Sequence, residues 1–207
     1  MVNGFIIKCI HSVVQSILNS EEEIESLDRA IGDGDHYINI KRGSMAVQSI
    51  ESELTSLPPD QAFKKIGMTL MTSVGGASGP LFASFFLALA KEIKSETNLQ
   101  QFSKGFTSGV KSIMDRGKSK LGDKTMLDVL IPVSEKLQLL ANEGCEKQEL
   151  IKEIDSIAMA GVIATKDMMP SKGRSAGLAE RAIGHIDPGA KTCQLIISTV
   201  CNELKLN

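Results

Sequence analysis

Three aspartates and a histidine lie within nine residues of sequence, at Asp28, Asp33, Asp35 and His36, and two glycines separate them. Ionised carboxylates placed this close together repel one another unless a divalent cation neutralises them or water solvates them fully. The glycines allow the backbone to fold back so that the acids converge. Because the candidate ligands are oxygens and no cysteine lies near, the segment predicts a site for Mg²⁺, which commonly leaves coordination positions for water and phosphate.

Alternatives stay open for this segment. One is a solvated acidic turn in which Asp35 caps the following helix. For His36 the alternatives are a hydrogen bond to phosphate and a role in capping and orienting the loop. An EF-hand fits poorly, because a helix follows Asp35 where the remaining loop ligands would be needed.

The glycine-rich run at 74–80 is a second candidate site, and it contains Ala77 and Ser78. It opens an apolar helix, and backbone N–H groups at such a helix start form an anion cradle that the helix dipole reinforces. The competing interpretation is a bare turn that uses glycine for positive φ. Phosphate oxygens would fit the cradle.

The sequence at 117–125, GKSKLGDKT, is close to a Walker A motif but is not one. Asp123 intrudes before the lysine, and no strand precedes the loop as a P-loop requires. Asp123 and Thr125 are more simply a helix start. Lys118 or Lys124 is then left to meet phosphate or solvent.

The longest loop, at 169–189, carries several basic residues, of which Arg174 is the best candidate for binding. Loops of this length inside compact domains usually bind something or are mobile. A solvated charge run is the alternative. Facing a metal centre formed by aspartates, these residues would complement the remaining phosphate charge, which suits a nucleoside polyphosphate.

The composition limits what such a site belongs to. The chain has 207 residues, 42% hydrophobic and 23% charged, with a formal net charge of -2. No linker divides it, so we expect a single domain over 1–207, and its charge favours neither nucleic acid nor an anionic membrane. The four cysteines lie far apart without a CxxC, which is typical of reduced thiols. The N-terminal segment soon reaches Lys8, too early for a signal peptide or a membrane span, so we expect a cytoplasmic protein.

Almost every segment carries the helical period of apolar residues, and almost none alternates as a strand would. The predicted fold is therefore all-α. We expect helices over 6–17, over 20–32 with a capping box of Ser20 and Glu23, over 38–54, from Asp60, after Pro80, over 98–117, after Asp123, from about 147, and from 188.

Short connections between long helices favour antiparallel neighbours in an up-and-down array. In such an array alternate connections lie at the same end. The four unusual segments fall on every second connection, whereas those at 55–59, 95–98 and 143–146 are plain polar turns. The four candidate segments should therefore share one rim.

Five motifs stand in the order found in a known family: GDGDH at 32–36 followed by Asn39, GGASGP at 75–80, GDKTMLD at 122–128, KGR at 172–174 and GHIDPGA at 184–190. Over nearly its whole length the chain closely resembles the nucleotide-binding L subunits of bacterial dihydroxyacetone kinases. The resemblance implies a barrel of eight helices that holds two Mg²⁺ ions through Asp28, Asp33 and Asp35, with ADP or ATP across the same rim. It implies no nucleophile on this chain. The nucleotide contacts that it implies are His36, Tyr37, Ile38, Asn39, Ala77, Ser78, Gly117, Met126, Arg174, Asp187, Pro188 and Gly189.

The resemblance also implies partners. In members that depend on the phosphotransferase system, a phosphohistidine on an M subunit rephosphorylates the bound ADP. The resulting ATP then gives its γ-phosphoryl to dihydroxyacetone on a K subunit. ATP-dependent relatives fuse the K-like and L-like modules, so a chain of this length favours the subunit form. A homodimer is compatible with these partners.

Some positions depart from the family pattern. Tyr37 stands where a small residue is common, Lys191 and Thr192 replace a more usual Thr-Ser pair, and residues 175–178 lack a tyrosine often found after the arginine. These departures leave open a kinase subunit for another small ketone or polyol. A non-catalytic regulatory or adaptor paralogue and a free phosphohydrolase using the same metals also stay open.

Overall fold

A computed structural model describes residues 2–94 and 98–206 of the chain. Its described part is helical, without a β-strand, so the all-α prediction is confirmed. In chain order the elements are α1 (Val2–Asn19), α2 (Glu21–Ile31), α3 (His36–Ser49), α4 (Glu51–Ser56), α5 (Pro59–Ser73), α6 (Ser78–Glu92), α7 (Leu99–Gly117), α8 (Leu127–Glu143), α9 (Lys147–Ala164), the 3-10 segments η1 (Thr165–Asp167) and η2 (Arg174–Ala182), and α10 (Pro188–Leu206).

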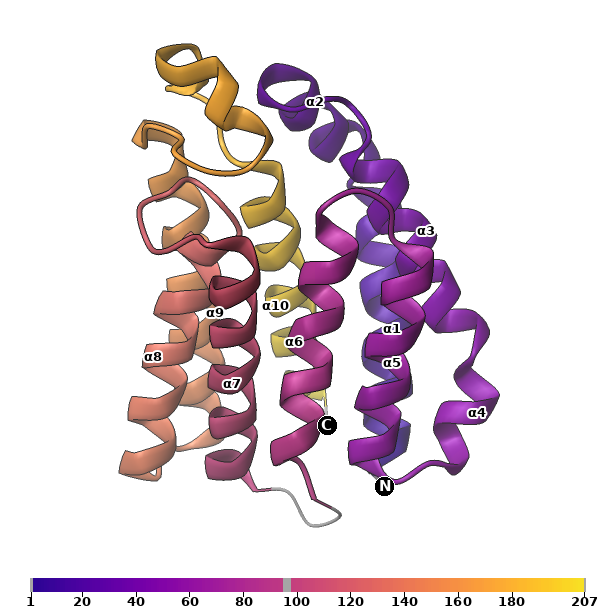
Figure 1. The fold of residues 1–207 in the computed structure, drawn as a ribbon. Coiled ribbons are helices and arrows are strands. Elements are labelled where there is room, and N and C mark those ends of the chain that lie inside the picture. The colour runs from indigo at the N-terminus through magenta and orange to yellow at the C-terminus, as the bar shows by residue number, and fades with distance from the viewer. Residues whose placement is uncertain (1, 95–97, 207) are drawn as a thin grey trace.

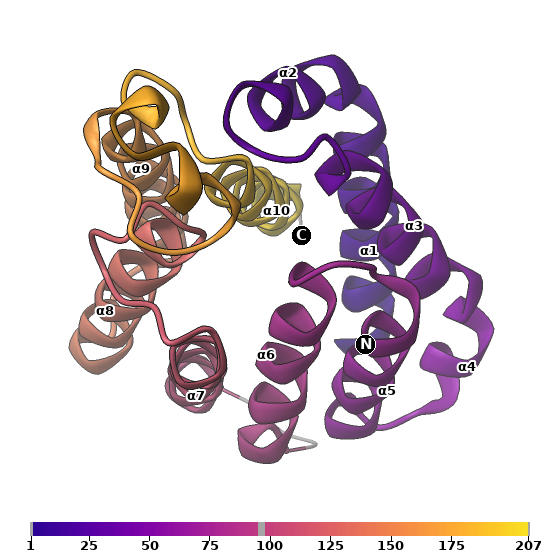
Figure 2. The same ribbon diagram turned by 45° about the horizontal axis from the view of Figure 1, so that its top comes forward.

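Eight of these helices form a closed ring. The order of packing around it is α1, α3, α5, α6, α7, α8, α9 and α10, and α10 packs against α1 to close it. Figure 2, tilted so that the top of Figure 1 comes forward, shows this ring, with the short helix α4 on its outer side, and α2 lies at the top end of the ring in Figure 1. In Figure 1 successive ring helices run in opposite directions, as short connections between long helices favour.

The core occupies two clusters inside the ring. One collects apolar side chains from α6 to α10, and the other collects those from α1 to α5. Phe63, Phe82 and Phe86 pack against both clusters and so connect the two halves. The apolar residues on these helix faces recur with the helical period that the sequence shows.

Several helix boundaries differ from the expected ones. The expected helix over 38–54 is divided at Ile50 into α3 and α4. α5 begins at Pro59, not with Asp60 as its cap, because a proline's fixed φ suits the first helical position. α6 begins at Ser78, before Pro80. The capping box at Asn98 is present, whereas Ser20 makes no side-chain cap.

The four candidate segments lie at one end of the ring, as the alternation of loops predicts. The connections α2–α3, α5–α6, α7–α8 and α9–α10 are together at the top of Figure 1. We call this end the rim. Of the three plain turns, those at 55–59 and 143–146 lie at the opposite end, and residues 95–97 lie outside the described residues. None of the described helices is both long enough and apolar enough to cross a membrane.

Candidate functional site

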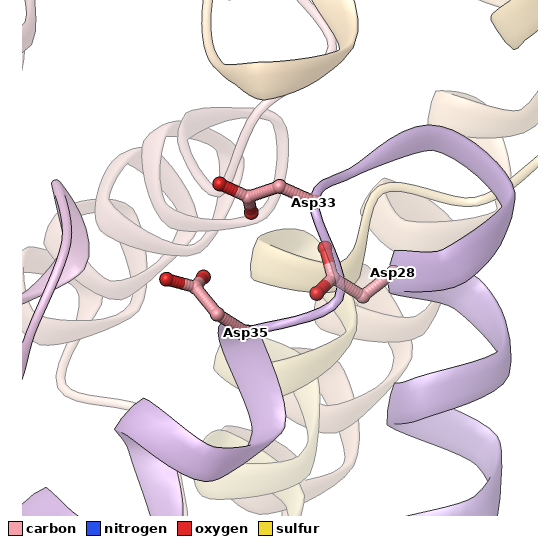
Figure 3. Close-up of side chains that lie close together, drawn as sticks. All are labelled: Asp28, Asp33 and Asp35. Carbon is pink, nitrogen blue, oxygen red and sulfur yellow. The ribbon is translucent and has the colours of Figure 1, made fainter.

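The three aspartates converge at the rim. Asp28 lies in the last turn of α2 and is 2% exposed, whereas Asp33 and Asp35 are exposed on the segment that leads into α3. Each offers a carboxylate oxygen, and these oxygens lie within 4.8 Å of one another. Figure 3 shows the three side chains gathered around one point. A hard divalent cation fits this set, because all donors are anionic oxygens.

Local backbone geometry brings these acids together. A Cβ on Gly32 would lie 1.8 Å from Oδ1 of Asp28, so only glycine leaves room for that carboxylate. Gly34 has φ +78, a conformation that side chains disfavour. The N–H of His36 donates to Oδ2 of Asp28 over 2.9 Å, which fixes the buried carboxylate. Asp35 precedes α3 without a side-chain capping bond, so the helix-cap alternative is wrong in that respect.

The glycine-rich segment lies beside the aspartates. Gly76 has φ +64, and a Cβ there would lie 3.9 Å from Oδ2 of Asp35 and 3.8 Å from Nη2 of Arg174. The same point is 3.6 Å from Nδ2 of Asn39, a buried residue on α3. Main chain at Gly76 therefore borders the acids, an amide and a guanidinium. The start of α6 is at Ala77 and Ser78, directly after it.

The basic segment reaches the acids through Arg174. Its Nε lies 3.1 Å from Oδ2 of Asp33, and both side chains are more than one-third exposed. An ion pair with this exposure contributes little to stability. Its position is the informative feature, because it places a guanidinium at the edge of the acidic cluster, where an anion bound to a cation would lie.

His36 joins this cluster to the start of α10. Its Nε2 lies 2.9 Å from Oγ1 of Thr192, and a hydrogen bond with the carbonyl of Pro188 favours its charged form. Burial lowers the pKa of His36, against the raising effect of Asp28 and Asp35. The imidazole is therefore fixed between α3 and α10.

The start of α10 completes this side of the rim. Oδ2 of Asp187 accepts the N–H of Ala190 over 2.7 Å, so Asp187 caps the start of α10. A Cβ on Gly189 would lie 3.1 Å from the carboxylate of Asp187 and 3.7 Å from Met126. Asp187, Pro188, Gly189 and Met126 thus lie together at the rim.

Other predicted contact residues are placed differently. The side chain of Tyr37 is buried in the core cluster of α1 to α5, and its hydroxyl donates to Glu21 over 2.9 Å. Any contact of Tyr37 with a ligand at the rim must use its main chain. Ile38 is 58% exposed, and Gly117 ends α7 on the surface.

The α7–α8 segment contains the residues that sequence reasoning places wrongly. The sequence leaves Lys118 or Lys124 to meet phosphate or solvent. Lys118 is exposed, whereas Lys124 is fully buried and donates to main-chain carbonyls of the α9–α10 segment. Asp123 does not start α8, which begins at Leu127, because its carboxylate accepts from Lys120 N–H and the Ser171 hydroxyl. In the sequence, the motif at 122–128 is what could have indicated these buried polar contacts. It has more polar residues than the start of a helix needs.

Helix direction adds positive potential at the rim. Because neighbours are antiparallel, α3, α6, α8 and α10 all begin there. Each helix N-terminus carries unsatisfied N–H groups and about +0.5 of an elementary charge. The site therefore combines carboxylates for a cation with N–H groups and a guanidinium for an anion.

Known proteins are similar in sequence to this chain. The DAK2 domain family matches residues 30–202. The "PEP-dependent dihydroxyacetone kinase, ADP-binding subunit DhaL" of Escherichia coli is 38% identical, over 91% of this chain and 91% of that protein. "PEP-dependent dihydroxyacetone kinase 2, ADP-binding subunit DhaL" of Listeria innocua is 37% identical, over 91% and 89%.

Longer proteins match as well. The human "Triokinase/FMN cyclase" is 29% identical over 95% of this chain, which corresponds to 34% of that protein. A crystal structure of the dihydroxyacetone kinase from C. freundii in complex with AMP-PNP and Mg²⁺ superposes with a TM-score of 0.76 at 22% identity, over 96% of this chain and 34% of that one. At this identity the likeness supports the fold alone.

Proposed function

The chain belongs to the DAK2 domain family, and from this premise we propose that it is the ADP-binding subunit of a PEP-dependent dihydroxyacetone kinase. Relatives with that name match it over about nine-tenths of both lengths. The whole rim lies within the residues that the family match covers, apart from Asp28 at its N-terminal edge. A kinase subunit thus agrees with the chemistry of the site.

The metal ligands in this proposal are Asp28, Asp33 and Asp35, which hold two Mg²⁺ ions. Their convergence within 4.8 Å supports a shared centre, and the exposure of Asp33 and Asp35 leaves room for phosphate oxygens as further ligands. When bound, Mg²⁺ neutralises phosphate charge and stabilises the charge that develops on the transferring group.

The nucleotide phosphates lie against the Gly76 main chain and the helix starts in this proposal, with Arg174 beside them. Gly76 supports this role because its Cβ position faces Asp35 and Arg174. The guanidinium supplies planar donors suited to phosphate. The remaining nucleotide contacts that we propose are His36, Tyr37 through its main chain, Ile38, Asn39, Ala77, Ser78, Gly117, Met126, Asp187, Pro188 and Gly189.

Catalysis by this chain rests on alignment and electrostatics. No nucleophile is assigned to it, and its residues bind and orient the phosphates while other subunits supply the reactants. We propose that a phosphohistidine-carrying M subunit rephosphorylates ADP, and that a K subunit presents dihydroxyacetone to the resulting ATP. The substrate then contacts the rim only through the K subunit.

One observation carries this proposal. A Cβ on Gly76 would have atoms of Asp35, Asn39 and Arg174 all within 3.9 Å. Elements far apart in sequence thus bring a cation site, a main-chain anion cradle and a guanidinium together. A free phosphohydrolase would also need a general base beside the phosphate, and Nε2 of His36, the histidine next to the acids, already lies 2.9 Å from Oγ1 of Thr192.

Retention of nucleotide tests the proposal. The purified protein, denatured after desalting in Mg²⁺, should release ADP into the supernatant, which mass spectrometry detects. Mixed with K and M subunits, the general phosphotransferase proteins and phosphoenolpyruvate, it should restore phosphorylation of dihydroxyacetone. A regulatory paralogue would retain ADP yet stay inactive in that mixture. Protein without ADP and without activity would contradict the kinase function itself.

A further inference from the structure

Lys124 is a fully buried lysine that holds a neighbouring segment by its backbone. It lies between α7 and α8 and is 0% exposed. Its ammonium donates to the carbonyl oxygens of Thr165, over 2.5 Å, and His185, over 2.6 Å, with Lys166 at 3.4 Å. One side chain therefore ties the beginning of the α9–α10 segment to its end.

The environment of Lys124 fits such a structural ammonium. An ammonium has three donors, and three carbonyls surround this one. Burial lowers the pKa of Lys124, while the carboxylates of Asp187, Asp167 and Asp128 act in the opposite direction. Lys124 also has φ +59, a left-handed conformation that is uncommon for a side-chain-bearing residue. Surrounding contacts must hold it there.

The α7–α8 segment that carries Lys124 is itself fixed. Asp128, in the first turn of α8, accepts the N–H of Gly122 over 2.6 Å and the N–H of Thr125 over 2.7 Å. Asp123, one residue before Lys124, accepts the hydroxyl of Ser171 over 2.5 Å with its carboxylate, and the N–H of Ser171 over 3.3 Å with its carbonyl. The loop thus holds the α9–α10 segment at its base and at Ser171.

Arg174 follows three residues after Ser171 in the segment held in this way. Its guanidinium reaches Asp33, while Gly173, with φ +74, turns the chain immediately before it. Lys124 itself donates to main-chain carbonyls at the two ends of the segment, whereas Arg174 pairs with the acids. Because it is fully buried, Lys124 is placed to fix Arg174 without touching a ligand at the rim.

We propose that Lys124 is a positioning residue, which sets the α9–α10 segment so that Arg174 faces the phosphates of the bound nucleotide. The claim that Arg174 faces the nucleotide phosphates rests on the proposed function, whereas the claim that Lys124 holds the α9–α10 segment does not. Two measurements test these claims separately.

The first measurement is hydrogen–deuterium exchange of the whole chain without nucleotide. Lys124→Met keeps the length of the side chain and removes the donors, and Lys120→Met, on the same loop but exposed, is the matched control. Peptides covering 165–187 should exchange at least about tenfold faster in Lys124→Met, with α1 to α6 unchanged. Equal exchange in Lys124→Met and wild type would overturn the inference, whether or not the protein binds ADP.

The second measurement is a double-mutant cycle on the dissociation constant of Mg–ADP, read by calorimetry. Lys124→Met and Arg174→Ala should each raise it about tenfold, and the double variant should exceed Arg174→Ala by less than about twofold. A purely structural role of Lys124 would multiply the two effects and contradict the inference. If wild type binds no Mg–ADP, the proposed function fails while the exchange result stands.

Ser171→Ala covers the case in which Lys124→Met does not fold. It removes the hydroxyl bond to Asp123 and leaves the buried ammonium in place. Faster exchange around Ser171 would support the same positioning role, provided that Mg–ADP also binds more weakly and that this loss of affinity is again non-additive with the loss in Arg174→Ala. Unchanged exchange and unchanged affinity would refute it.

Discussion

Gly32→Ala should separate cation binding from folding. The new Cβ would lie 1.8 Å from Oδ1 of Asp28 and 2.9 Å from the carbonyl oxygen of the same residue. The carboxylate is the movable end of a side chain and can rotate away, whereas the carbonyl oxygen belongs to the backbone, so the last turn of α2 must also shift slightly. Movement of the carboxylate breaks the bond from the N–H of His36 and takes one ligand out of the acidic cluster.

The magnitudes follow from these contacts. Losing a hydrogen bond to a charged group costs about 1.5–3 kcal/mol, part of which water recovers at this rim. The free energy of unfolding should therefore fall by about 1–2 kcal/mol, which corresponds to a fall in Tm of roughly 2–8 °C for a chain of this size. Metal sites lose about 10–100-fold in affinity when a ligand or its support is disturbed, and we expect that range for Mg²⁺.

Calorimetric titration with Mg²⁺ and ADP measures the binding, and thermal unfolding measures the fold. Gly4→Ala is the matched control, because nothing lies within 4 Å of its Cβ position and alanine favours a helix. It should leave binding unchanged. If Gly32→Ala binds Mg²⁺ as wild type does, the reasoning that places Asp28 in the metal site is wrong.

Two further predictions concern the acids and the buried tyrosine. Asp33→Ala or Asp35→Ala should lose Mg²⁺ and ADP with little change in Tm, because both side chains are exposed and the exposed pair of Asp33 with Arg174 contributes little to stability. ADP at full occupancy in either variant would refute the metal assignment. Tyr37→Phe removes the hydroxyl that donates to Glu21, so the free energy of unfolding, measured by chemical denaturation, should fall by about 1 kcal/mol. The affinity for Mg–ADP should stay within about twofold of the wild-type value. A large loss of affinity would show that the hydroxyl contributes to nucleotide binding.

The sequence predicts the helices well, because apolar periodicity is a local property that packing preserves. It is weaker where a boundary depends on tertiary contacts. Ile50, which divides α3 from α4, carries no helix-breaking signal. Pro59 can begin α5 as well as precede it, so sequence alone does not separate it from a cap at Asp60. The grouping of the four segments at one rim is predictable from topology alone.

The candidate site divides in the same way. The aspartates and the glycine segment can be found from residue types, because few other roles require them in this pattern. Lys124 cannot, since a lysine between an aspartate and a threonine is expected to be exposed, and only the fold brings the Thr165 and His185 carbonyls to it. Thr192, which bonds His36, lies too far away in sequence to be paired with it.

Charge explains why the proposed nucleotide site would need both cations and helix ends. Asp28, Asp33 and Asp35 present anionic oxygens within 4.8 Å of one another, and a diphosphate would add charge of the same sign. Arg174 offers a single positive charge at the edge, and it already pairs with Asp33. The helix starts contribute about half a charge each and cannot move toward the phosphates. Neutralising both sets of oxygens therefore requires divalent cations between them, which is the reason to propose more than one Mg²⁺ and to expect that neither the metal nor the nucleotide is held firmly without the other.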